Sequence, residues 1–238
     1  MSALQDLCPG GVLRAAINLG NPALARRSGG PEALTGVTVA LAYELSRRIG
    51  CELALLPFES AGKVMAARPE DIWDIAFLAI DPDRAAEVAF TGPYVVIEGV
   101  YVVKRDSPWT RPDQLDRPGV KIVVGRGAAY DLHLSRTLRC AELVRAETSS
   151  DALRQFASLN LDAGAGVRQA AATFVAQYAE FRLLDEPFMQ IRQAIALPRD
   201  RSAGLAYLDA FVEEMKVSGF VRNALDASGQ DHLQVPIN

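Results

Sequence analysis

Short runs of apolar residues rich in Val and Ile recur along the chain, and stretches with helical spacing separate them. This alternation predicts an α/β protein with largely parallel strands. Apolar residues four apart, followed by Gly50, predict a helix over 36–49, and similar spacing predicts another around 205–215. The expected strands cover residues 12–19, 51–58, 74–80, 95–103, 121–125, 142–146, 162–167 and 193–198.

Two polar segments, 104–112 and 198–201, each follow a long apolar strand and suggest boundaries inside this pattern. If the preceding strands cross between lobes, the chain has two lobes joined by two hinge strands. No apolar run is long enough to span a membrane, so membrane insertion is not expected. The predicted lobes are 10–102 plus 199–238 and 105–196, with hinges near 101–105 and 194–199.

The composition is that of an ordinary folded protein, because half of the 238 residues are hydrophobic and 23% are charged. The formal net charge of -4 is spread along the chain, which argues against nucleic acid as a partner. His133 and His232 stand alone, and no catalytic, metal-binding or phosphate-binding motif is present. We therefore expect a monomer that needs no metal and no cofactor.

The three cysteines, Cys8, Cys51 and Cys140, are far apart and show no metal-ligand spacing. We expect each to be a small buried residue, and we expect no disulfide. Residues 1–11 lack the basic start and apolar run of a secretory leader. The chain as written is therefore expected in the cytoplasm, or in the periplasm if a leader has been removed.

Arg84 follows the strand predicted over 74–80, in the run Asp81-Pro-Asp-Arg84. α/β proteins place ligands beyond the carboxyl ends of their strands, and the planar fork of arginine accepts a carboxylate with two hydrogen bonds. A bound carboxylate is one interpretation. A surface arginine paired with Asp83 or Glu87 is the other.

A second candidate is the turn Gly125-Arg-Gly127-Ala128-Ala129-Tyr130, which joins a strand to a helical stretch. Small residues there leave backbone N–H groups free, and a helix start attracts anions. A tight turn without a ligand is the alternative.

Two polar residues lie in the strands predicted to cross between the lobes: Glu98 inside the apolar strand 95–103, and Gln193 in the other crossing strand. The side chain of each points either to a cleft or to solvent. Arg168 and Gln169 open a helix and have the same two interpretations.

Taken in order, these segments resemble the amino-acid type (family 3) extracellular solute-binding proteins of ABC importers. The similarity covers nearly the whole chain, and its most specific part is Asp81-Pro-Asp-Arg84 followed by Phe90-Thr-Gly-Pro-Tyr94. The resemblance implies a two-lobed periplasmic-binding-protein-like (type II) α/β fold with two hinge strands. It also implies that Arg84 and the Gly127–Ala129 amides hold a ligand carboxylate, with Tyr130 near the ligand's side chain.

Several positions depart from the family pattern. Family members commonly have an aromatic residue that stacks on the ligand, followed by a proline, where this chain has Gly20-Asn21-Pro22. Asn21 is therefore the candidate ligand contact in place of the aromatic ring. Ala128 replaces a hydroxyl residue, and Val167 replaces the acidic residue that holds an α-amino group. A buried ammonium without a partner is costly, so an α-amino acid ligand would need Glu98 to supply the missing charge.

The resemblance predicts a non-catalytic binding protein for a small carboxylate-bearing solute, with an ABC permease as possible partner. Two other functions stay open at this point. A dehydratase of the cyclohexadienyl type would use Glu98 as general acid, with apolar surroundings favouring its protonated form. The other is a cytoplasmic ligand sensor or a scaffold, of which only the scaffold, with an unused cleft, would bind no small acid.

Overall fold

The computed structural model describes residues 2–30 and 33–236, and these residues form two compact units. One unit comprises Met1–Val96 and Arg192–Asn238, and the other comprises Ile97–Ile191. Strands β7 (Val95–Lys104) and β12 (Met189–Pro198) both run through the division. The predicted hinges at 101–105 and 194–199 fall a few residues after it.

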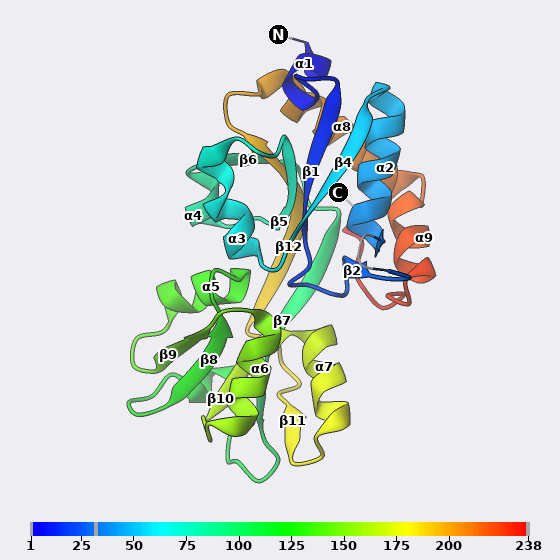
Figure 1. Ribbon diagram of the computed structural model, residues 1–238. Helices are drawn as coiled ribbons and strands as arrows, with labels where there is room; N and C mark the ends of the chain where they lie inside the picture. The colour runs from blue at the N-terminus through cyan, green and yellow to red at the C-terminus, as the bar shows by residue number, and fades with distance from the viewer. Residues whose placement is uncertain (1, 31–32, 237–238) are drawn as a thin grey trace. The chain divides into compact units, whose positions relative to one another are not determined.

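The sheet of the first unit has strand order β4-β1-β5-β12, with β6 beside β12. Strands β1, β4 and β5 are parallel, whereas β12 is antiparallel to β5 and to β6. Figure 1 shows β1 and β4 side by side, with α2 against them. The elements before β7 are α1 (Ala3–Leu7), β1 (Val12–Asn18), β2 (Arg26–Arg27), β3 (Leu34–Thr35), α2 (Val37–Ile49), β4 (Glu52–Phe58), α3 (Ala61–Ala66), η1 (Arg68–Glu70), β5 (Ile75–Ala79), α4 (Pro82–Ala85) and β6 (Val88–Phe90).

After β12 the first unit is completed by α8 (Ser202–Val217) and α9 (Phe220–Ala227). Glycines bound α2 at both ends. Gly50 ends it in the left-handed conformation, with φ of 69°. Gly36 precedes it with φ of 123°, and a Cβ there would lie 2.2 Å from the carbonyl oxygen of Leu24. Only glycine fits this entry to the helix.

The sheet of the second unit has strand order β7-β10-β8-β9, with β11 on the other side of β7. Strands β10, β8 and β9 are parallel, and β7 is antiparallel to β10. Phe156 of α6 and Phe174 of α7 help to form the core of this unit. Its other elements are η2 (Pro112–Leu115), β8 (Lys121–Gly125), α5 (Ala129–Thr137), β9 (Glu142–Ala146), α6 (Ser149–Ser158), β10 (Ala163–Val167), α7 (Arg168–Gln177) and β11 (Phe181–Leu183).

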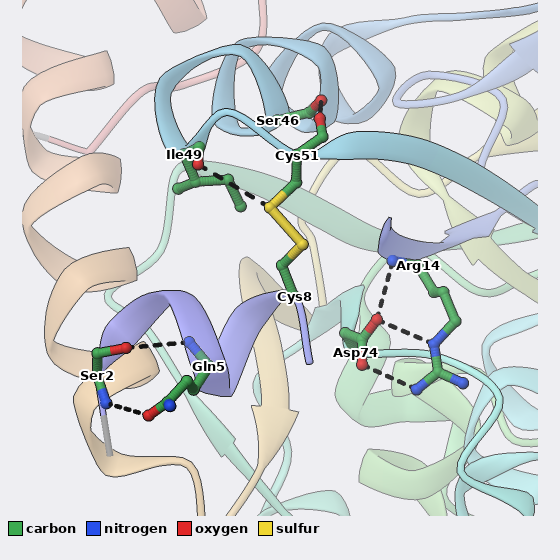
Figure 2. Close-up of a disulfide and its surroundings, with 8 residues drawn as sticks. All are labelled: Ser2, Gln5, Cys8, Arg14, Ser46, Ile49, Cys51 and Asp74. Atoms are coloured by element: carbon green, nitrogen blue, oxygen red, sulfur yellow. Dashed lines mark hydrogen bonds and ion pairs between the residues drawn. A yellow bond between two sulfur atoms is a disulfide. The ribbon is translucent and has the colours of Figure 1, made fainter. Parts of the chain in front are cut away.

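A disulfide between Cys8 and Cys51 joins the end of α1 to the start of β4 (Figure 2). The expectation that these cysteines are unbridged was wrong. Spacing could not reveal the pair, because the parallel register of β1 with β4 brings together residues 43 apart in sequence. Cys140 is a free thiol and is exposed, so its expected burial was also wrong.

The amino-terminal end of β5 is held by Asp74, whose side chain is fully buried. Arg14 of β1 donates from its backbone N–H and from its guanidinium to this carboxylate, at 2.8–3.0 Å (Figure 2). Arg201 Nη1 donates to Asp74 Oδ1 at 2.9 Å. Burial opposes ionisation, but these hydrogen bonds outweigh it and hold the pKa of Asp74 below its usual value. This network fastens the end of the sheet opposite to the candidate residues.

Candidate functional site

The strand order of the first unit creates a topological switch point between β1 and β5. From β1 the chain passes through α2 to β4 on one side, and it then returns to β5 on the other side of β1. In open α/β sheets the connections diverge at such a point, which leaves a crevice beyond the carboxyl ends of the two strands. Asn21 follows β1 in a loop and Arg84 follows β5 in the short helix α4 (Pro82–Ala85), so both candidates lie beyond the carboxyl ends of these strands.

Arg84 lies in α4, a single turn whose start is fixed by Pro82 and by the Asp81 carboxylate, which accepts from the N–H of Asp83. Its Nη1 donates to the carbonyl oxygen of Ala79 at 3.0 Å, which ties the guanidinium to the end of β5. The residue is only 3% exposed. A solvated surface arginine, the alternative from sequence, does not fit this burial.

The burial of Arg84 has an electrostatic consequence. Desolvation lowers the pKa of its guanidinium to about 10, although the nearby Asp81 carboxylate opposes the shift. The group still carries its charge at neutral pH. Since a poorly hydrated cation gains more from an anionic partner than a hydrated one does, a carboxylate that reaches Arg84 would be bound strongly.

Gln193 and Asn21 belong to the same region of the first unit. Gln193 of β12 pairs with Ala79, and its carbonyl accepts the N–H of Tyr94 at 2.8 Å. Both Gln193 and Asn21 are 6% exposed. Within the described residues, neither Nδ2 nor Oδ1 of Asn21 has a hydrogen-bond partner. The fold thus gathers three predicted residues around the carboxyl ends of β1 and β5.

The second unit has its own switch point, between β8 and β10. The chain leaves β8 through α5 to β9 on one side, and it then passes through α6 to β10 on the other. The turn Gly125–Ala128 follows β8, and Arg168 follows β10 directly. Both candidates of this unit therefore lie beyond the strand ends where α/β sheets place ligands.

The amide groups of this turn are not all available, contrary to expectation. Gly127, with φ of 68°, donates its N–H to Asp131 Oδ2 at 2.8 Å, and Ala128 donates its N–H to the carbonyl of Gly125 at 3.1 Å. Asp131 is 3% exposed and also accepts from Arg145 Nε at 2.9 Å. The anion at the start of α5 is therefore the chain's own carboxylate. An acidic residue in the first helical turn was the sequence signal for it.

Tyr130 serves the interior of the second unit. Its side chain is buried, and its hydroxyl donates to Ser149 Oγ at 2.8 Å. Burial raises the pKa of this phenol to about 12, and the hydrogen bond with Ser149 opposes the shift. Because its polar atom already has a partner, Tyr130 gains no support as a ligand contact.

Glu98 and Arg168 form an ion pair within the second unit, in which Arg168 Nε donates to Glu98 Oε2. Arg168 Nη2 also donates to the carbonyl of Asp185 at 2.7 Å. The Glu98 side chain is 41% exposed. The carboxylate is therefore a partly solvated member of an ion pair, and this exposure gives no support to the general-acid hypothesis.

The described residues contain no group of three or more His, Cys, Asp or Glu side chains placed to hold a metal ion. In the described part of the chain, every helix is too short or too polar to cross a membrane.

Comparison with known proteins shows a match over most of the chain. The model of the family described as bacterial extracellular solute-binding proteins, family 3, matches residues 13–227. No curated protein matches the sequence itself. A mutant of ArgBP from T. maritima has a similar structure, with a TM-score of 0.80 and 22% identity over 95% of this chain and 99% of that one.

Two other solved structures extend the likeness. The cysteine-binding protein from Campylobacter jejuni has a TM-score of 0.81 at 16% identity, covering 100% of this chain and 97% of its own. The ancestral amino acid-binding protein AncCDT-1, described as a precursor of cyclohexadienyl dehydratase, has a TM-score of 0.79 at 20% identity, covering 95% and 99%. At such identities the structures show the shared two-lobed α/β fold, as predicted, and leave the ligand open.

Proposed function

Because the chain belongs to family 3 of the bacterial extracellular solute-binding proteins, we propose that it binds a small carboxylate-bearing solute without transforming it. Arg84 receives the carboxylate. The observation that carries this proposal is the burial of a charged guanidinium at the switch point of the first unit, tied to the end of β5. Asp81 already acts on this guanidinium, and the planar fork of arginine matches the two oxygens of a ligand carboxylate.

Two acidic side chains of the second unit already have partners within that unit. Glu98 is engaged by Arg168, and Asp131 is engaged by Gly127 and Arg145. The proposed ligand class is therefore defined by its carboxylate, and organic acids without an amino group belong to it alongside amino acids.

The disulfide supports a place of action outside the cytoplasm. Structural disulfides persist in oxidising compartments and are rare where thiols are kept reduced. Together with the family, this favours the periplasm or cell exterior, where an ABC permease would receive the bound solute.

A thermal-shift screen tests the proposal with amino acids, 2-oxo acids, aromatic acids and dicarboxylates. At a ligand concentration 100-fold above Kd, binding adds about 2.7 kcal/mol, which raises the Tm of a chain of this size by about 5–11 °C. Arg84→Ala should abolish the shift, whereas Arg47→Ala, which removes an arginine side chain that is 70% exposed, should keep it. Equal shifts in wild type and Arg84→Ala would contradict the proposed role of Arg84. Turnover of a prephenate-like acid would contradict a purely binding function.

A further inference from the structure

Asn21 has an unusual environment for a polar side chain. The residue is 6% exposed, yet neither its amide nitrogen nor its amide oxygen has a hydrogen-bond partner within the described residues. Leaving a buried polar group unpaired costs free energy, so native structures supply a partner from the protein, from ordered water or from a ligand.

The backbone that carries this side chain is held in place by hydrogen bonds. The carbonyl of Asn21 accepts the N–H groups of Leu24 at 3.0 Å and of Ala25 at 3.2 Å, and residues 23–25 are buried. The turn is fixed further by Thr38, whose hydroxyl donates to the carbonyl of Leu24 at 3.1 Å. The backbone that carries the unsatisfied amide is therefore already ordered, so no backbone ordering is needed when a ligand arrives.

The loop of Asn21 and the loop of Arg84 follow the two strands that define the switch point of the first unit. A ligand whose carboxylate meets Arg84 would lie beyond the carboxyl ends of β1 and β5, the region that Asn21 also borders. We propose that Asn21 forms a neutral polar subsite, and that the ligand carries a hydroxyl or carboxamide group in addition to its carboxylate. This inference rests on the proposed function.

The chemistry of the amide selects this class of group. Nδ2 is a donor and Oδ1 is an acceptor, so a partner that satisfies both must itself accept and donate. An ammonium group only donates, and a carboxylate only accepts. Hydroxyl and carboxamide groups do both. A subsite that hydrogen-bonds such a group discriminates strongly against analogues that lack it.

Matched pairs of acids test the subsite by calorimetry or thermal shift: threonine against valine, glutamine against methionine, and 4-carbamoylbutanoate against hexanoate. In wild type, the polar member of at least one pair should bind about fivefold or more tightly than its apolar partner. Asn21→Leu, which is similar in size, should abolish this preference. Gln230→Met, which removes another buried amide oxygen without a partner, should retain it.

The possible failures are distinguishable. If acids bind through Arg84 but the preference is absent, or survives in a folded Asn21→Leu protein, ordered water is the partner of Asn21 and this inference is overturned. If Asn21→Leu does not fold, Asn21→Ala, which also lacks a polar side chain, is measured in its place with the same criterion. If no acid binds to wild type, the proposed function and this inference fall together.

Discussion

Removal of the disulfide between Cys8 and Cys51 is expected to destabilise the first unit by about 4 kcal/mol. The bridge closes a loop with a sequence separation of 43, and the loop-closure entropy that it removes from the unfolded chain corresponds to about 4 kcal/mol at 25 °C. The perturbation is the double variant Cys8→Ala/Cys51→Ala. We expect it to fold, because Asp6 of α1 also accepts the N–H of Gly204 and keeps α1 in contact with α8.

Urea unfolding followed by indole fluorescence measures this loss. Trp73 is 1% exposed and lies in the first unit, whereas Trp109 lies in the second. A Trp109→Phe background leaves Trp73 as the only indole, so the signal reports the unit that holds the disulfide. With an m value of about 2 kcal/mol/M, the midpoint should fall by about 2 M.

Reductant and Cys140→Ala serve as controls. Wild type treated with reductant should match the double variant, and Cys140→Ala should match untreated wild type because Cys140 is a free, exposed thiol. A midpoint difference below about 0.5 M between oxidised wild type and the double variant, with bridge formation verified by mass spectrometry, would refute the loop-closure reasoning.

Two further substitutions probe buried polar groups. Asp74→Asn removes the carboxylate that Arg14 and Arg201 share. Unfolding in urea at pH 7 should show that the free energy of unfolding falls by about 3 kcal/mol. Because the pKa of Asp74 is lowered in the folded state, its contribution to the free energy of unfolding is present above its unfolded pKa and is lost as pH falls through its folded pKa. The difference in free energy of unfolding between wild type and Asp74→Asn should therefore become smaller in acid. A difference that does not change with pH would contradict the ion-pair account. Tyr94→Phe removes a buried hydroxyl that has no partner in the described residues, so stability in urea should stay within about 1 kcal/mol of wild type or rise. A loss above about 2 kcal/mol would reveal a hydrogen-bonded phenol.

The strands and helices that carry long apolar patterns could be predicted from sequence, because side-chain periodicity depends on local backbone geometry. The predicted strands 121–125 and 142–146 coincide with β8 and β9, and the predicted helix 36–49 differs from α2 by one residue. The three-residue strands β6 and β11 were not predicted, since each is too short to show a period and forms by pairing with a distant strand.

Arg84 and the turn at Gly127 could also be named as candidates from sequence, since they follow predicted strands and match a family pattern. Their partners could not. The guanidinium of Arg168 beside Glu98, the Asp131 carboxylate at Gly127 and the bridge between Cys8 and Cys51 each join residues from different elements. Local sequence determined which side chains are available and which elements carry them. Only the tertiary structure decided which of these groups already satisfy one another, because hydrogen bonds and disulfides depend on distances that chain folding sets.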